Sequence, residues 1–163
     1  MKIRMGMIGG GEGSFIGPVH RMAARLDGII ELVSGAFSSD PMISGVTGAR
    51  EGLKEDRIYG DWQEMIKKES KLPEDVKPHF IAIVTPNHLH YGPAKMALEH
   101  GFNVLCDKPL CISVAEAEDL YHSVERSGKL FCLTHNYTGY PMVKRAREMV
   151  AGGEIGMIRK IVV

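Results

Sequence analysis

An acid, a lysine and a proline follow a short apolar stretch in the middle of the chain, at Asp107, Lys108 and Pro109. The apolar stretch, residues 102–106, has the pattern of a buried strand, and Ser113-Val-Ala-Glu116 opens a helix with a capping box. Lys108 is therefore expected in a turn at the carboxyl end of a strand, where open α/β sheets bind their ligands. Because the proline restricts the lysine to extended conformations, Lys108 would reach a ligand with little freedom to lose. The tripeptide alone fits an ordinary surface turn equally well, so the interpretation depends on the rest of the chain.

A glycine-rich segment near the amino terminus indicates what that ligand is. A strand pattern over residues 2–8 runs into Gly9-Gly-Gly-Glu-Gly-Ser-Phe-Ile-Gly17, and a helix pattern follows over residues 18–26. This order forms the dinucleotide fingerprint, in which glycines let the backbone approach a pyrophosphate at a helix amino terminus. The third glycine of the fingerprint is Gly17 instead of residue 14, so we expect a loop about three residues longer than usual. Val19, Met22, Ala23 and Leu26 lie on one face of this helix.

Composition indicates a globular protein of ordinary type. The 163 residues correspond to about one domain, with 44% hydrophobic and 25% charged residues. A formal net charge of zero gives no footprint for nucleic acid or an anionic membrane, and no apolar run approaches the roughly 20 residues that span a bilayer. No secretory signal pattern is present, and Cys106, Cys111 and Cys132 lack paired spacing. We therefore expect reduced thiols in a cytoplasmic protein.

Strand and helix patterns alternate along the rest of the chain. Such alternation implies right-handed crossovers and a parallel sheet covered by helices on both faces. The predicted fold class is α/β, a doubly wound (Rossmann) parallel sheet of about six strands in a single domain. The glycine loop after the first strand favours the Rossmann strand order over the other doubly wound order. Strands are expected at 29–37, 78–84, 102–106, 130–134 and 157–163, and helices at 41–53, 61–70, 87–99 (capped by Asn87), 114–127 and 141–151.

With these motifs placed, the chain resembles the amino-terminal domain of the glucose–fructose oxidoreductase/inositol dehydrogenase family (Gfo/Idh/MocA). Matching pieces occur in order: the glycine loop followed by His20-Arg21, then Val84 to His90, Val104 to Pro109, and Gly153-Glu-Ile-Gly156. The resemblance covers essentially the whole chain. It implies a nicotinamide-dependent oxidoreductase that moves a hydride to or from a hydroxyl-bearing carbon, commonly of a sugar or cyclitol. The family usually has Glu-Lys-Pro, so Asp107 is a conservative departure.

The resemblance places Lys108 near the nicotinamide and the substrate hydroxyl. A cation there stabilises developing alkoxide charge, and a lysine made less basic by burial could also relay the proton. We assign charge stabilisation first and proton relay second, because an unperturbed lysine with a pKa of about 10.4 is a poor base at neutral pH. Lys108 is the predicted catalytic residue. The predicted cofactor-binding residues are Gly9, Gly11, Ser14, Phe15, Ile16, Ser38, Ser39, Thr85, Pro86, Asn87, His90, Asp107, Lys108 and Asn136.

The choice between NAD and NADP is left open by the sequence. NAD-binding folds usually carry an acid at the end of the second strand, and this chain has Phe37 there, followed by Ser38-Ser39-Asp40. Nothing at Phe37 repels a 2′-phosphate, and no nearby Arg or Lys attracts one; Asp40 would serve if the turn curls back. His88 and His90 lack a third ligand and do not indicate a metal site. His20 is interpreted as a helix-packing residue, and Asn136 either touches the nicotinamide end of the cofactor or is a plain loop residue.

Residues 1–153 are predicted to form the dinucleotide-binding domain, and residues 154–163 to begin the second α/β domain that the resemblance implies. That domain holds most of the substrate pocket in the family, so we expect the chain alone to be inactive. The last strand pattern would lack a sheet of its own, which favours a homo-oligomer. The expected partner is a sugar- or cyclitol-like small molecule, with neither nucleic acid nor membrane. The alternative function is a non-catalytic NAD(P)-binding module or sensor.

Overall fold

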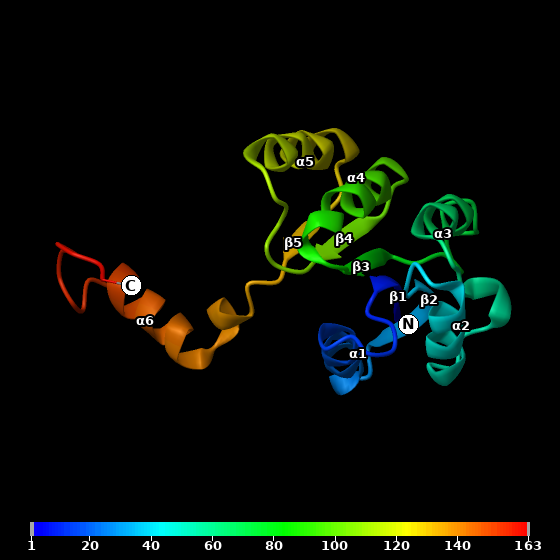
Figure 1. Cartoon of the computed structure of the whole chain (residues 1–163). Coiled ribbons are helices and arrows are strands. Elements are labelled where there is room, and N and C mark those ends of the chain that lie inside the picture. Colours follow the sequence, from blue (N-terminus) through cyan, green and yellow to red (C-terminus); the bar gives the residue numbers. More distant parts are fainter. Residues whose placement is uncertain (1, 163) are drawn as a thin grey trace. The chain divides into compact units, whose positions relative to one another are not determined.

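The computed structural model describes residues 2–162 (Figure 1). Contacts divide the chain into two compact units, one ending at Leu133 and the other beginning at Thr134, and each is described by itself. The first unit contains β1 (Ile3–Gly9), α1 (Ile16–Leu26), β2 (Ile30–Ala36), α2 (Pro41–Arg50), η1 (Glu55–Arg57), α3 (Trp62–Glu69), β3 (Phe80–Val84), η2 (Asn87–Leu89), α4 (Tyr91–Glu99), β4 (Asn103–Cys106), α5 (Val114–Ser127) and β5 (Phe131–Leu133). The second contains η3 (Asn136–Gly139) and α6 (Pro141–Ala151).

The first unit is built on a five-stranded sheet with the order β2-β1-β3-β4-β5, and all neighbours run parallel. A single parallel bridge joins Ile58 to Gly35 of β2, and Tyr59 N donates to Gly35 O at 2.8 Å. If the bridge at Ile58 is counted as a further strand beside β2, the spatial order becomes Ile58-β2-β1-β3-β4-β5, which is the strand order of the Rossmann fold. Only one residue pairs there because η1 ends at Arg57 and the cap of α3 lies at Asp61.

Helices cover both faces of this sheet, as the doubly wound prediction requires. On one face, Met65 and Ile66 of α3, Ala97 and Leu98 of α4 and Leu120 of α5 join one buried cluster. On the other face, Ile16 and Ala24 of α1 pack against a second cluster that includes Met7 and Phe37. Figure 1 shows α3, α4 and α5 on one side of the sheet and α1 on the other.

Local capping explains the helix boundaries that agree with the prediction. Ser113 accepts a hydrogen bond from Glu116 N, and Gly128 ends α5 in the left-handed conformation at φ 63°. Asp40 caps α2 by accepting from Met42 N. Asp61 caps α3 by accepting from the backbone N–H groups of Gln63 and Glu64. The helices predicted at 114–127 and 141–151 have those bounds in the structure.

The apolar face of α1 is exposed in the structure. Val19, Met22 and Leu26 are exposed, Leu26 by 82%, and the buried residues of the helix are Gly17 and Arg21. Gly17 faces the glycine loop, because the absence of a side chain allows the helix to approach it closely. Val19, Met22 and Leu26 are consequently left exposed.

Two expectations are corrected. Residues 157–162 form no strand among the described residues and are exposed, because no neighbouring strand is present there to pair with them; Val163 lies outside the described residues. Asn87 does not cap α4: it begins the short turn η2, and α4 starts after His90 with no side-chain cap. The domain boundary expected after residue 153 stays a prediction.

The second unit is a short helical segment. In α6 no residue is buried, and Arg145 donates to both carboxylate oxygens of Glu154, at 3.0 and 3.1 Å. The rings of Tyr137 and Tyr140 meet edge to face with centroids 5.6 Å apart. Within residues 2–162, no helix is both long enough and apolar enough to span a membrane.

Candidate functional site

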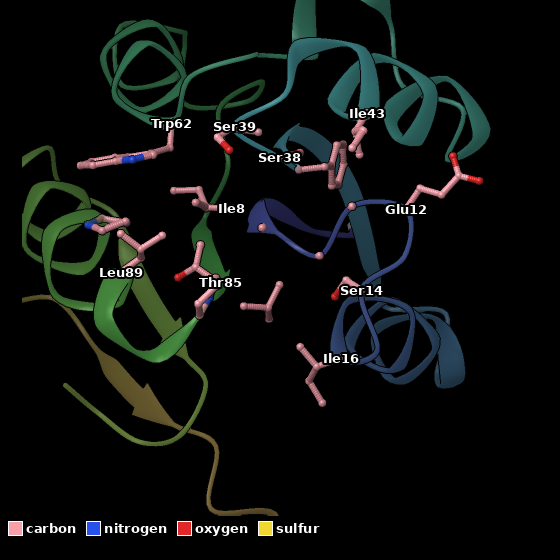
Figure 2. A pocket seen from close by; sticks show the side chains of 18 of the residues that line it. Ile8, Glu12, Ser14, Ile16, Ser38, Ser39, Ile43, Trp62, Thr85 and Leu89 are labelled. Atoms are coloured by element: carbon pink, nitrogen blue, oxygen red, sulfur yellow. The ribbon is translucent and has the colours of Figure 1, made fainter. Parts of the chain in front are cut away.

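A cavity of about 890 Å³ lies at the carboxyl ends of β1, β2 and β3. The glycine-rich loop forms part of its wall, and the residues after β2 and β3 form further parts. Figure 2 shows Ser14 and Ile16 on one side of this space, Trp62 and Leu89 on the opposite side, and Thr85 between them. This is the edge of an open α/β sheet where ligands bind.

At several of its glycines the loop packs so tightly that a side chain would have no room. Gly9 and Gly10 have φ angles of 84° and 76°, and Gly11 N donates to Phe37 O at 2.9 Å. A Cβ on Gly11 would lie 2.8 Å from Phe37 O, and a Cβ on Gly17 would lie 2.3 Å from Gly10 O. Gly17 is therefore the position at which α1 approaches the loop most closely. The loop leaves bare backbone at a helix amino terminus, which suits a pyrophosphate.

Arg21 supports this loop from behind and was missed by the sequence reasoning. Its side chain is 8% exposed, donates to Gly10 O at 2.7 Å and pairs through Nε with Glu51 at 2.8 Å. The guanidinium also lies 5.9 Å from the centre of the Phe37 ring. Arg21 thus joins the loop to the end of β2. Its only signal in the sequence is its place beside His20, after the loop.

The turn after β2 presents hydroxyls and no carboxylate to the cavity. Ser38 and Ser39 line it, whereas the Asp40 carboxylate accepts from Met42 N at 2.8 Å and does not line it. Asp40 is held as a helix cap, so the curled-back turn that would bring it to a ribose is absent. Glu12 lies at the rim, where it pairs with Arg50 at 2.6 Å.

The turn after β3 contributes Thr85, Pro86 and Leu89 to the wall of the cavity. The Thr85 hydroxyl is buried and has no hydrogen-bond partner among the described residues. The Ser34 hydroxyl, which does not line the cavity, is buried without a partner in the same way, so this feature alone does not indicate a ligand contact. Asn87 and His90, predicted beside the cofactor, do not line the cavity.

His90 lies behind the cavity instead. It is 1% exposed, with Nδ1 2.6 Å from Pro109 O and Nε2 2.9 Å from Thr85 O. Its ring therefore joins the turn after β3 to the turn after β4.

Lys108 lies in the turn after β4, as predicted from its position behind a strand. Asp107 N donates to Ile83 O at 3.0 Å, and Lys108 N donates to Asp107 Oδ1 at 2.9 Å. The Lys108–Pro109 peptide bond is cis. Lys108 is exposed and, like Asp107, lies outside the residues that line the cavity. The two roles expected of Lys108, charge stabilisation first and proton relay second, stay predictions.

His20 connects the glycine-loop helix to the lysine turn. Its Nε2 lies 3.9 Å from Asp107 Oδ2, with both side chains largely buried. Burial lowers the pKa of His20 below 6.5, and the Asp107 charge opposes that shift. The interpretation of His20 as a packing residue thus misses a second role, a contact with the acid beside Lys108.

The structure gathers most of the predicted cofactor residues of the first unit around the cavity. Asn136 begins η3 in the second unit, so its proposed contact with the nicotinamide stays a prediction. The sequence reasoning did not predict the wall formed by Trp62, Leu89 and Pro93, because these residues reach the cavity only through packing between distant segments. The cavity residues that were predicted are Gly9, Gly11, Ser14, Phe15, Ile16, Ser38, Ser39, Thr85 and Pro86, and those missed include Glu12, Ile43, Asp61, Trp62, Leu89 and Pro93.

Fold and site together define a nicotinamide dinucleotide-binding Rossmann domain. Residues 3–137 match the oxidoreductase family with an NAD-binding Rossmann fold (Gfo/Idh/MocA), and the chain belongs to this family. It therefore carries an NAD-binding domain.

Several relatives and solved structures are similar over nearly the whole chain. The uncharacterized oxidoreductase YfiI of Bacillus subtilis is 34% identical, and the levoglucosan dehydrogenase of Pseudarthrobacter phenanthrenivorans is 28% identical, over 98% and 96% of this chain. The chain spans 40% and 39% of their lengths. An oxidoreductase from Sinorhizobium meliloti superposes with a TM-score of 0.91 at 50% identity, over 98% of this chain and 44% of that one. An inositol dehydrogenase homolog from Azotobacter vinelandii, complexed with NADH and myo-inositol, gives a TM-score of 0.91 at 36% identity, over 98% of this chain and 41% of that one.

Proposed function

We propose that this chain is the cofactor-binding part of an oxidoreductase that moves a hydride to or from a sugar- or cyclitol-like hydroxyl. The observation that carries the proposal is the glycine loop, whose Gly11 and Gly17 have no room for a side chain beside an open cavity. The substrate class is supported by the relatives, since one is named a levoglucosan dehydrogenase and another structure holds myo-inositol.

Each group of site residues has a proposed contact with the cofactor or the substrate. Backbone N–H groups of the loop and the start of α1 would hold the pyrophosphate, and the hydroxyls of Ser38 and Ser39 would meet the adenosine ribose. Thr85 lines the cavity and would contact the bound cofactor. When bound, the nicotinamide supplies the hydride chemistry. Lys108 would stabilise negative charge on the substrate oxygen.

The lining of the cavity supports NAD over NADP. Its charged residues are Glu12 and Asp61, both acidic, and no Lys or Arg is among the lining residues that the structure describes. Arg50, a cation beside the lining, is bonded to Glu12 at 2.6 Å, so a 2′-phosphate would have to compete with that carboxylate for it, whereas ribose hydroxyls would meet Ser38 and Ser39. We therefore expect tighter binding of NADH than of NADPH.

Trp62 provides the test, because it lines the cavity and is the only tryptophan in the chain. Binding of NADH should quench its fluorescence and sensitise the emission of the reduced nicotinamide. Gly11→Val should abolish the signal, because a Cβ there meets the Phe37 carbonyl at 2.8 Å. Gly45→Ala in α2, where a Cβ meets nothing within 4 Å, is the matched control. No response of the folded chain to either cofactor at millimolar concentration would contradict the proposal.

Two finer proposals concern the molecule in the cell. We propose that copies of the chain associate, since Met157, Ile161 and Val162 are each exposed by at least 75%. We also propose a cytoplasmic location, supported by three free cysteines.

A further inference from the structure

A buried imidazole joins two turns of different function at the carboxyl edge of the sheet. Thr85, whose carbonyl lies 2.9 Å from His90 Nε2, lines the cofactor cavity. Pro109, whose carbonyl lies 2.6 Å from His90 Nδ1, directly follows Lys108. The ring is 1% exposed, so protein instead of water surrounds this connection.

We propose that His90 is a positioning residue, which fixes the lysine turn relative to the cofactor cavity and transmits occupancy of the cavity to Lys108. This inference rests on the proposed function, because it gives Lys108 a bound cofactor to be positioned against. His90 itself touches neither cavity nor substrate in this geometry, so it acts through the backbone of the two turns.

The contacts around Lys108 explain why this connection matters. The lysine side chain is exposed, so its position depends on its backbone. Asp107 N is bonded to Ile83 O, and Lys108 N to the Asp107 carboxylate, which secures the amino side of the turn. On the carboxyl side, Pro109 O is held by His90. A ligand that contacts Thr85 therefore reaches the lysine turn through one side chain.

The hydrogen-bonding capacity of imidazole makes this role hard to replace. The two nitrogens lie on opposite sides of one rigid ring, and each is within hydrogen-bond distance of a carbonyl oxygen, of Pro109 and of Thr85 respectively. The donors of a glutamine share one nitrogen, and it cannot span both carbonyls in the same way. His90→Gln should keep one connection at most, and His90→Phe should keep neither while filling a similar volume.

The first test needs no ligand. Amide hydrogen exchange by NMR on the 163-residue chain should show faster exchange at Asp107 and Lys108 in His90→Phe, by about tenfold, which corresponds to one lost hydrogen bond. Exchange at core amides such as Met65 should change less. His100→Gln is the matched control, since that ring also contacts a backbone carbonyl, Met96 O at 2.9 Å, at the other end of the same helix. An equal acceleration at core and turn, or none at the turn, would overturn the proposal; His90→Gln provides the measurement where His90→Phe fails to fold.

The second test uses ADP, which contains the adenosine diphosphate half of NAD and lacks the nicotinamide. In the unmodified chain, ADP should shift the amide signals of the glycine loop, of Thr85 and of Lys108. In His90→Gln the loop and Thr85 shifts should persist and the Lys108 shift should disappear. A Lys108 shift that survives in His90→Gln would refute transmission through His90. Absence of any loop shift in the unmodified chain would instead count against the proposed function, and the exchange experiment would still decide the role of His90.

Discussion

At the scale of single residues, Lys108 combines an exposed side chain with a fixed backbone. Its amide, the Asp107 amide and the Pro109 carbonyl are all hydrogen-bonded, yet the amine lies outside the cavity lining. This arrangement fits the proposed role of a cation that meets the substrate oxygen and contributes little to holding the adenosine half of the cofactor.

Lys108→Met should therefore separate binding from chemistry. We expect NADH affinity of the chain to change by less than about twofold, because the amine is exposed and lies outside the residues that line the cavity. In a longer protein that carries the remaining part of the relatives, turnover should fall by about a hundredfold or more, the usual cost of removing a group that stabilises developing charge. Lys71→Met, also an exposed lysine, is the control. A large loss of NADH affinity in Lys108→Met alone would show that the amine binds the cofactor directly.

The buried His20 should make stability depend on pH. Its pKa is lowered below 6.5 chiefly by burial, so the unfolded chain binds its proton more readily than the folded chain does. Stability must then rise with pH through this region and fall as the pH drops below 6.5. Urea unfolding between pH 7 and pH 5 should show a shallower loss of stability in His20→Gln than in the unmodified chain. His122→Gln, at an exposed site, is the control; identical slopes for His20→Gln and the unmodified chain would refute the assignment.

At the scale of elements, the approach of α1 to the glycine loop is the feature most sensitive to a single atom. A Cβ on Gly17 would lie 2.3 Å from Gly10 O and 2.4 Å from Gly10 Cα, and neither backbone atom can move without displacing the loop. Gly17→Ala should destabilise the fold by about 1–3 kcal/mol, as overpacking does. It should also weaken NADH binding more than its effect on folding explains. Urea unfolding and the Trp62 titration measure the two effects, with Gly45→Ala as the open-space control. Unchanged binding in Gly17→Ala would mean that the third glycine of the fingerprint lies elsewhere.

Elements defined by nearby residues were predictable from the sequence, and elements defined by distant partners were not. The bounds of α5 follow from Ser113 and Gly128, both adjacent to the helix. The strand expected at 157–163 failed because strand formation needs a neighbour, which sequence patterning alone does not supply. In α1 the buried residues are Gly17 and Arg21, so apolarity alone does not indicate which residues of this helix turn inward.

In the site, too, motifs that are local in the sequence were predictable and contacts between distant segments were not. The glycine loop and the Asp107–Pro109 turn were identified because each motif is continuous in the sequence and directly follows a strand. Trp62 and Ile43 came to the cavity through helices that start after other strands, and no local pattern marks them. The position of His90 behind the cavity depends on two carbonyls 19 and 5 residues away, which only the folded chain brings together.

At the scale of the whole molecule, the exposed apolar end of the chain predicts self-association. Met157, Ile161 and Val162 are exposed by 81%, 75% and 79%, and burying a large apolar side chain contributes roughly 1.5–3 kcal/mol. The chain should be at least partly dimeric by light scattering at tens of micromolar, and a version ending at Gly153 should be monomeric. Because residues 157–162 form no strand, we expect two copies to meet through their apolar side chains and not through pairing of strand edges. Two monomeric samples would refute the prediction.

Cofactor binding and catalysis should also separate in the whole molecule. The 163 residues contain a cavity for the dinucleotide, with Lys108 outside its lining, and they span about 40% of the length of YfiI. Catalysis additionally requires the substrate carbon to be held in line with the nicotinamide, and positioning of this kind can contribute about 7–11 kcal/mol. Lys108 is exposed and lies outside the residues that line the cavity, so we expect NADH to bind and turnover to be negligible. NAD reduction with myo-inositol and a panel of sugars, followed by absorbance, measures this. Turnover by the short chain that disappears in Lys108→Met would show that these residues alone suffice to position the substrate. In a longer protein, NADH binding without any Lys108-dependent turnover would instead favour a non-catalytic module or sensor.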